Sequence, residues 1–203
     1  MSEGTFVVLA SGRGTNFQAI IDKTGEGRIK ARCVGLITDN PEAYAITLAK
    51  KAGIETHVVD YRSFSDKHQY EDTLMATIAR YNPDLVVLAG YMRLLGSRIV
   101  DAYEGKMMNI HPSLLPAFQG LHAQKQALAY GTKIAGCTVH FVTHDMDAGP
   151  IVIQRTVPVL DDDDEKSLSE RILVEEHQAF PDAIRLFFDG RLSVDERRVR
   201  ILP

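Results

Sequence analysis

The sequence contains little cysteine, no long apolar run and no excess of positive charge. Cys33 and Cys137 are the two cysteines in 203 residues, and both lie in apolar stretches. A free cysteine in such a stretch commonly behaves as a small buried hydrophobe, so we expect no disulfide. No apolar run reaches the length of about 18 residues typical of a membrane-spanning helix, and residues 1–4 lack the basic region of a signal peptide. These absences indicate a reduced, soluble, cytoplasmic protein.

The charge balance and the length narrow the class further. The chain carries 23 Lys and Arg residues against 27 Asp and Glu residues, a net charge of -4, whereas a face that binds nucleic acid is normally clearly basic. Small molecules are therefore the expected partners, with no nucleic acid and no membrane. With 45% hydrophobic residues the chain can bury one substantial core, and residues 1–203 are predicted to form a single domain.

The first half alternates short β-branched runs with longer amphipathic stretches, which is typical of βαβ units around a parallel sheet. Residues 85–89 are apolar throughout, as expected for a central strand covered on both faces. Gly53 and the Asn82-Pro83 pair are expected to end two helices. The predicted strands are residues 6–10, 34–38, 56–59, 85–89 and 106–110, and the predicted helices are residues 16–23, 42–52, 65–81 and 97–103.

The second half has a different pattern. Residues 138–142 and 151–157 are separated by too few residues for a crossover helix, which predicts an antiparallel extension of the sheet. Helices are expected at residues 124–130 and 167–188, the second after an acidic run that suits the positive end of the helix dipole. The expected fold is α/β, a Rossmann-like open sheet that is mostly parallel in the N-terminal half. The expected parts are a phosphate-binding half at about 1–105, a second half at about 106–190 that carries the chemistry, and a short C-terminal tail.

Residues 11–16, Ser-Gly-Arg-Gly-Thr-Asn, lie between the first predicted strand and the first predicted helix. Backbone N–H groups at such a helix start can approach an anion closely. The loop lacks the third glycine of a dinucleotide fingerprint and the Lys-Ser/Thr ending of a P-loop. A nucleoside monophosphate or a sugar phosphate fits it better than a dinucleotide or ATP. Gly12 and Gly14 could instead serve only a tight turn, but ligands of open α/β sheets collect beyond the carboxyl ends of the strands.

A predicted strand presents Asn109 and His111 on one face of its C-terminal end, because side chains alternate along an extended chain. Pro112 and Pro116 stiffen the loop that follows. Asp147 lies in a turn-like segment, where its carboxylate could orient the imidazole and handle protons through a water. Each residue alone has an ordinary structural explanation. Together they supply an amide, an imidazole and a carboxylate, the groups needed to move a carbonyl group between two amines.

Six segments together resemble the phosphoribosylglycinamide formyltransferases. The likeness runs in order from residue 6 to about residue 192, and its Asn-x-His-Pro-Ser-Leu-Leu-Pro element is shared across the wider formyltransferase superfamily. That element indicates the chemistry better than the substrate, whereas the phosphate loop and the lack of extra domains favour this family. The six segments are residues 11–16, 88–93, 109–116, 120–122, 139–142 and 147–150.

The resemblance implies that 10-formyltetrahydrofolate, as co-substrate, gives its formyl group to the amine of glycinamide ribonucleotide, with no metal. It implies that Asn109 donates a hydrogen bond to the developing oxyanion and that the imidazolium form of His111 stabilises the same oxygen. Asp147 would set the protonation of that imidazole and carry a proton away from the amine. The implied binding residues are Gly14, Thr15 and Asn16 for the ribonucleotide phosphate, Glu176 for its ribose and glycinamide side, and Lys67, Met92, Arg93, Leu94, Leu95, Thr143, His144, Asp145 and Met146 for the reduced folate.

Three alternatives are weaker. A formyltetrahydrofolate deformylase passes the formyl group to water with the same three residues, but such relatives carry an additional N-terminal domain. A methionyl-tRNA formyltransferase needs a C-terminal tRNA-binding domain and a more basic surface. A non-catalytic nucleotide-binding sensor predicts loss of the reacting residues.

Thr138 stands where many family members have serine and Gln119 where proline is common, and neither change removes a reacting group. We expect a monomer or a homodimer.

Overall fold

In a computed structural model, which describes residues 3–203, the chain forms two compact units, residues 1–108 and 109–203. The break lies near the predicted transition at about residue 105. The single domain spanning residues 1–203 stays a prediction. One strand, β5 (Met107–His111), crosses from the first unit into the second.

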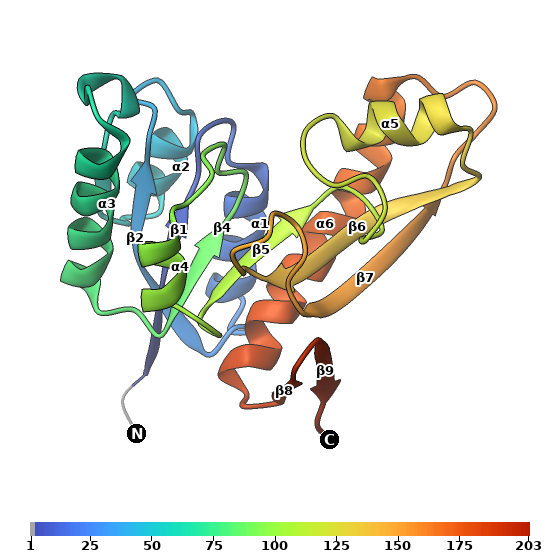
Figure 1. The fold of residues 1–203 in the computed structure, drawn as a ribbon. Coiled ribbons are helices and arrows are strands. Elements are labelled where there is room, and N and C mark those ends of the chain that lie inside the picture. Colours follow the sequence, from blue (N-terminus) through green and yellow to red (C-terminus); the bar gives the residue numbers. More distant parts are fainter. Residues whose placement is uncertain (1–2) are drawn as a thin grey trace. The chain divides into compact units, whose positions relative to one another are not determined.

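The first unit is built on four parallel strands in the order β3-β2-β1-β4. The side chains of Phe6, Val7, Val8 and Leu9 are fully buried, because a parallel strand in the middle of a sheet is covered on both faces. Since the strands are parallel, their carboxyl ends lie at one edge (Figure 1). The strands are β1 (Gly4–Leu9), β2 (Ala31–Thr38), β3 (Thr56–Val58) and β4 (Leu85–Leu88).

The helices of the first unit follow their sequence signals closely. The longest, α3, buries Tyr70, Leu74 and Ile78 at helical spacing. It begins after Asp66, whose carboxylate accepts the His68 N–H at 3.0 Å, which satisfies one of the unpaired donors of the first turn. The helices are α1 (Thr15–Gly25), α2 (Ala45–Lys51), the short 3-10 helix η1 (Tyr61–Ser63), α3 (Lys67–Tyr81) and α4 (Ser97–Ala102).

The helix predicted at residues 42–52 begins three residues late, and Asn40 is the reason. Its side-chain oxygen accepts the Glu42 N–H at 3.0 Å and its backbone carbonyl accepts the Ala43 N–H at 3.1 Å. Asparagine stabilises turns in this way by capturing nearby backbone donors. The segment after β2 is therefore a turn, and the prediction for its first three residues was wrong. Gly53 follows the helix with a φ of 68°, as expected for the residue after a helix end.

The second unit consists of a long antiparallel pair, β6 and β7, backed by the helix α6. In Figure 1, α6 crosses behind both strands. The acidic run before α6 caps the helix, since the Asp164 carboxylate accepts the Ser167 N–H at 2.7 Å and the Ser167 hydroxyl accepts the Asp164 N–H at 3.0 Å. The elements of this unit are α5 (Ala123–Tyr130), β6 (Ile134–Phe141), β7 (Ile151–Pro158), α6 (Glu165–Phe188), β8 (Leu192–Asp195) and β9 (Arg198–Ile201).

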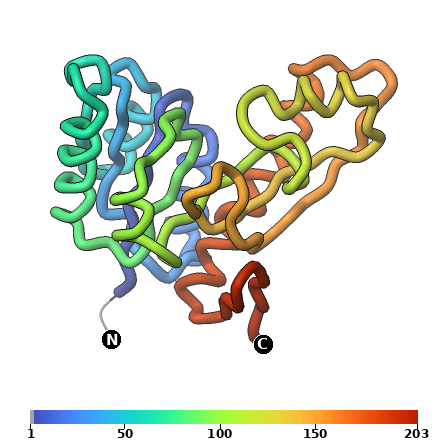
Figure 2. The backbone as a smooth tube through the Cα atoms, in the orientation of Figure 1, coloured from blue at the N-terminus to red at the C-terminus, as the bar shows by residue number. Residues whose placement is uncertain are grey.

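The short C-terminal tail contains a β-hairpin at residues 192–201, which was not predicted from the sequence. Strands β8 and β9 pair antiparallel, and Ile151 of β7 pairs with Arg198 of β9 in parallel (Figure 2, red end of the chain). The turn carries Glu196 at a φ of 50°. Glycine and asparagine usually mark such a turn, and their absence here hid the hairpin.

The structure confirms the predicted α/β class, with parallel strands in the N-terminal half and antiparallel pairing in the C-terminal half. Both cysteines are buried and free, also as predicted. Within the described part of the chain, no helix is both long and apolar enough to cross a membrane.

Candidate active site

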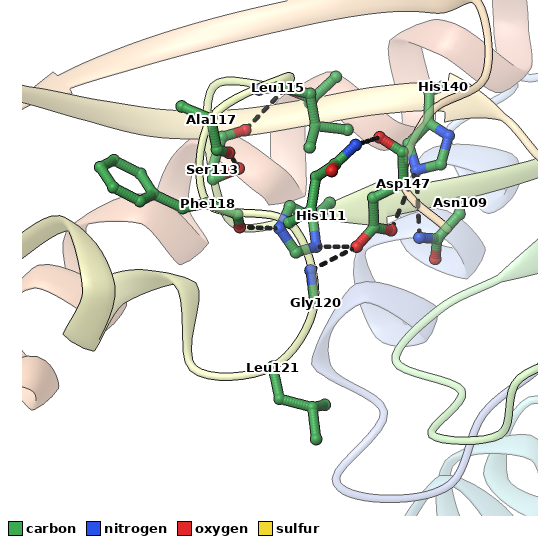
Figure 3. Close-up of polar contacts among 12 residues, drawn as sticks. Asn109, His111, Ser113, Leu115, Ala117, Phe118, Gly120, Leu121, His140 and Asp147 are labelled. Carbon is green, nitrogen blue, oxygen red and sulfur yellow. Dashed lines mark hydrogen bonds and ion pairs between the residues drawn. The ribbon is translucent and has the colours of Figure 1, made fainter. Parts of the chain in front are cut away.

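The second unit brings four polar side chains, from two strands and a turn, into one connected group. His111 ends β5, Asp147 lies in the turn between β6 and β7, and the His111 Nδ1 lies 3.3 Å from the Asp147 Oδ2. Both side chains are at least nine-tenths buried. Figure 3 shows the Asp147 carboxylate between the imidazoles of His111 and His140, with Asn109 below His140. The predicted group Asn109, His111 and Asp147 is therefore assembled around a fourth residue.

Both ring nitrogens of His111 face hydrogen-bond acceptors. The Nε2 atom lies 2.8 Å from the backbone carbonyl of Phe118, and a carbonyl oxygen can only accept. The Nδ1 atom faces the Asp147 carboxylate, and the same carboxylate oxygen accepts the Gly120 N–H at 2.9 Å. Only the doubly protonated ring satisfies both contacts. The geometry therefore favours the imidazolium form of His111 beside an ionised Asp147.

The environment of Asp147 keeps that carboxyl ionised. Burial alone raises its pKa, but the contact with His140, the hydrogen bond from the Gly120 N–H and the charge of His111 together lower it by more. The pKa of Asp147 therefore lies below the usual range for aspartate. A carboxylate of this kind stays charged and can hold an imidazolium in place.

His140 orients the amide of Asn109. Its Nδ1 lies 2.9 Å from the carbonyl of Phe141 and must donate there, so Nε2 is the ring nitrogen that faces Asn109. The Asn109 Nδ2 lies 3.3 Å from that Nε2. One N–H of the amide is thereby held by His140, and the second N–H remains for another acceptor. The His140 Nε2 is 3.7 Å from the Asp147 Oδ1, beyond hydrogen-bond length.

The turn that carries Asp147 depends on backbone geometry that few residues tolerate. Asp147 has a φ of 51°, in the left-handed region that aspartate and asparagine enter more readily than most residues. A Cβ at Gly149 would lie 1.8 Å from the carbonyl oxygen of Phe141, so only glycine fits there. Pro150 returns the chain to the sheet, where the Phe141 N–H donates to its carbonyl at 2.9 Å. The Asp-Ala-Gly-Pro sequence thus places the carboxylate beside His111.

In the first unit, the predicted phosphate loop forms the N-terminus of α1. Gly14 has a φ of 71°, and a Cβ there would lie 2.9 Å from the Cβ of Ala45. Glycine is needed both for the conformation and for the close approach of α2. Thr15 and Asn16 occupy the first turn, where backbone N–H groups have no partner within the helix. The structure thus places Gly14, Thr15 and Asn16 where anions bind to helices.

Ser11 ties this loop to the segment after β4. Its N–H donates to the carbonyl of Gly90 at 3.1 Å, and its hydroxyl accepts the Met92 N–H at 2.9 Å. Met92 and Leu94 expose about two-thirds of their surface, at 65% and 63%. Exposed methionine and leucine side chains side by side on a loop suit contact with a flat apolar ligand. Leu95 is half-buried.

Arg93 is held by two neighbours that the sequence does not indicate. Its Nε lies 2.7 Å from the buried carboxylate of Asp39, and its guanidinium carbon lies 4.1 Å above the ring of Tyr61. The hydrogen bond to Asp39 raises the pKa of Arg93, and desolvation offsets part of that rise. An isolated arginine on a protein surface usually extends into solvent. Arg93 is instead fixed by its ion pair, and its side chain is still 39% exposed.

The remaining predicted binding residues lie in three places. Lys67 begins α3 and pairs with Glu71 at 3.3 Å. Residues 143–146, from Thr143 to Met146, lead to the Asp147 turn; Thr143 is half-buried, and Met146 is 55% exposed. Glu176 is buried on α6.

Sequence patterns missed His140, and they missed the backbone partners of His111. The pattern of residues 138–142 predicts a strand and assigns no role to His140. An imidazole inside an apolar strand is itself a signal, because a buried polar group must find hydrogen bonds. The backbone groups of Phe118 and Gly120 leave no signal at all, since every residue has a carbonyl and nearly every residue an N–H.

Known proteins resemble this chain in sequence and in fold. Residues 5–184 match the family described as formyl transferase. The chain is 42% identical over 190 residues to a phosphoribosylglycinamide formyltransferase of Escherichia coli (strain K12), covering 94% of this chain and 90% of that one. It is 39% identical over 180 residues to a protein of the same name from Bacillus subtilis (strain 168), with 89% and 92% covered. A crystal structure of glycinamide ribonucleotide transformylase 1 from Symbiobacterium toebii superposes with a TM-score of 0.97 at 48% identity, over 99% of this chain and 95% of that one.

Proposed function

This chain belongs to the formyl transferase family, and we propose that it transfers the formyl group of 10-formyltetrahydrofolate to the amine of glycinamide ribonucleotide, a step of purine biosynthesis. The observation that carries the proposal is the group formed by Asn109, His111 and Asp147, in which His111 has an acceptor at each nitrogen. That group stabilises negative charge on a carbonyl oxygen without a covalent intermediate.

The proposed reaction begins with attack of the substrate amine on the formyl carbon. A C–N bond forms, the C=O π electrons move to the oxygen, and the amine nitrogen becomes positively charged. The free N–H of Asn109 then donates a hydrogen bond to the oxyanion, a contribution of about 100- to 1000-fold in rate for one such donor. The His111 imidazolium, whose two N–H groups face Phe118 and Asp147, stabilises the oxyanion through its positive charge. His140 keeps the Asn109 amide turned in the required direction.

Collapse of the intermediate needs one proton removed and one delivered. Asp147, ionised beside His111, takes part in removing the proton of the attacking nitrogen, directly or through a water. The bond from the formyl carbon to the folate nitrogen then breaks, and that nitrogen leaves with a proton. Holding the two substrates in line supplies much of the remaining advantage.

The substrate assignment rests on the relatives and on the loop at residues 11–16. Relatives that share about two-fifths of their sequence with this chain are named for phosphoribosylglycinamide. A phosphate group matches the helix N-terminus at Gly14, Thr15 and Asn16. Glu176, on α6, is the proposed partner of the ribose and glycinamide side.

The residues proposed to bind the folate lie in two loop segments and at the first residue of α3. Met92, Arg93, Leu94 and Leu95 offer exposed apolar side chains and an oriented guanidinium. Thr143, His144, Asp145 and Met146 lead to the reacting carboxylate, and Lys67 is the proposed partner of the anionic folate tail. No metal takes part in the proposed mechanism, and a cytoplasmic location follows from the substrates.

The test is an absorbance assay of 10-formyltetrahydrofolate consumption, run with and without glycinamide ribonucleotide. We expect consumption to depend on the ribonucleotide and to yield one formylated amine for each folate released. Consumption at the same rate without any amine would instead identify a formyltetrahydrofolate deformylase. If binding of the ribonucleotide occurs with no consumption at all, the non-catalytic sensor is the better description. A dephosphorylated substrate with unchanged kcat/KM would refute the role of residues 11–16.

A further inference from the structure

The loop between His111 and Leu121 supplies two backbone groups to the candidate site. The carbonyl of Phe118 accepts the His111 Nε2–H at 2.8 Å, and the N–H of Gly120 donates to Asp147 at 2.9 Å. Figure 3 shows both contacts on the same loop. The protonation and the direction of the imidazole therefore depend on where this loop lies.

A single buried hydroxyl holds the beginning of that loop. Thr138, on β6, has no exposed surface. Its Oγ1 donates to the carbonyl of Ser113 at 2.7 Å and accepts the Leu115 N–H at 3.0 Å and the Gln154 Nε2–H at 3.0 Å. One donor and two lone pairs are all that a threonine hydroxyl has. The hydrogen-bonding capacity of Thr138 is fully used, and two of its three partners are backbone groups of the loop.

Gln154 completes the contact from the neighbouring strand. It pairs with Thr138 in the register of β6 and β7, and its Nε2 also donates to the carbonyl of Leu115 at 2.9 Å. Both hydrogens of the amide are thereby used. Three backbone groups of the loop, the Ser113 carbonyl and both polar groups of Leu115, are fixed to the sheet by two side chains.

Two further contacts continue the path from this clamp to Phe118. The Ser113 hydroxyl donates to the carbonyl of Ala117 at 2.6 Å, and the Ala117 N–H donates to the carbonyl of Leu114 at 3.1 Å. A Cβ at Gly136 would lie 2.0 Å from the carbonyl oxygen of Arg155 on β7, so the neighbouring strand requires glycine there, and 2.8 Å from the Leu114 side chain. Hydrogen bonds to the sheet thus fix Ser113 and Leu115, and bonds within the loop extend this to Ala117.

We propose that Thr138 and Gln154 are positioning residues that set the imidazolium of His111 by holding the loop at residues 113–118. This proposal rests on the proposed function for its kinetic consequence. It makes one distinctive claim, that a hydroxyl whose hydrogen bonds go to Ser113, Leu115 and Gln154 controls how His111 is protonated. A hydroxyl that merely stabilised the fold would leave that protonation unchanged.

The test compares the full-length wild type with Thr138→Val, Thr138→Ser and Gln154→Leu. Valine keeps the volume but leaves the Ser113 carbonyl and the Leu115 N–H without a partner, so we expect kcat to fall about 10- to 100-fold, the scale of a displacement of about 1 Å at a reacting group. The KM for the ribonucleotide should stay constant. Serine restores the hydroxyl and should recover most of the rate, and Gln154→Leu should lose less than Thr138→Val.

The second readout is ¹⁵N NMR of the His111 ring at fixed pH without substrates. We expect the doubly protonated ring in the wild type and in Thr138→Ser, and a mixture with neutral forms in Thr138→Val. Thr77→Val is the matched control, since Thr77 is also buried and donates only within α3, to Thr73 at 2.7 Å. It should match the wild type in both readouts.

Several outcomes overturn the proposal. Folded Thr138→Val with wild-type kcat, or with lower kcat but unchanged His111 signals, rules out the positioning role. If Thr138→Val does not fold, Gln154→Leu decides, because Gln154 is exposed, and an unchanged rate with unchanged signals in that variant rules out the positioning role as well. If the wild type transfers no formyl group, the proposed function fails, while the NMR comparison still decides the positioning role.

Discussion

Asp147→Asn is the sharpest test of the charge at the candidate site. The substitution keeps the size of the side chain, and asparagine tolerates the positive φ of this position as aspartate does. The amide oxygen can still accept the Gly120 N–H, so the turn is preserved. What disappears is the negative charge 3.3 Å from the His111 Nδ1. The variant therefore removes the counter-ion of the imidazolium and little else.

The size of the effect follows from that distance. Two unit charges at 3.3 Å attract each other by about 5 kcal/mol at an effective dielectric constant near 20. Removing one partner of a buried pair typically costs about 3–5 kcal/mol. That cost falls on folding stability. For the rate, loss of a positioned acid–base group lowers kcat by about 100- to 10,000-fold, and this is the expected range.

The assay measures formylfolate consumption at saturating ribonucleotide, with ribonucleotide binding followed separately by calorimetry. We expect binding to survive, because the phosphate loop belongs to the other unit. Asp161→Asn is the matched control, since the Asp161 side chain is 95% exposed and its pair with Lys133 is a surface contact. A wild-type kcat for Asp147→Asn would remove the charge from the mechanism. Equal losses in both variants would show that the effect does not come from the site.

Three further predictions follow from other contacts. Asn109→Ala removes one oxyanion donor, and we expect kcat to fall about 100- to 1000-fold with little change in KM, as steady-state kinetics can show. The pKa of Asp147 is lowered in the folded protein, so its contribution to stability is present above the usual aspartate pKa and is lost as the pH falls through the lower folded value. The stability of Asp147→Asn should therefore fall less steeply with decreasing pH than that of the wild type, as acid unfolding followed by circular dichroism can show. Burial raises the pKa of Cys33 and Cys137 to about 12. A thiol reagent at a pH of about 8, below the ordinary cysteine pKa, should therefore label neither cysteine until denaturant is added. Rapid labelling of the native protein would contradict the buried positions.

The sequence predicts the fold well where burial alone decides the structure. Residues 85–89 are apolar throughout, and β4 is fully buried over the four residues that form it. The spacing of Tyr70, Leu74 and Ile78 predicts α3, and all three side chains face the core. Such elements are determined by apolar surface, which a sequence displays directly.

Prediction fails where one polar side chain or one backbone angle decides. Asn40 delays α2 by capturing two N–H groups, a choice that apolar spacing does not reveal. The hairpin of β8 and β9 turns at Glu196, a residue that seldom takes a positive φ. A single capping or turn hydrogen bond contributes about 1 kcal/mol, which decides where an element begins or turns. That free energy is small beside the free energy of burying a whole strand.

The candidate site divides in the same way between what is visible in the sequence and what is not. Asn109, His111 and Asp147 are recognisable because their side chains carry the chemistry. The hydrogen bond at the His111 Nε2 comes from the carbonyl of Phe118, and every residue has a carbonyl, so no residue type marks it. What the sequence retains of the loop position is indirect: a threonine on β6 and a glutamine on β7 that bond to the loop. Under the positioning proposal, residues such as Thr138 carry information about the protonation of the site although they do not contact His111.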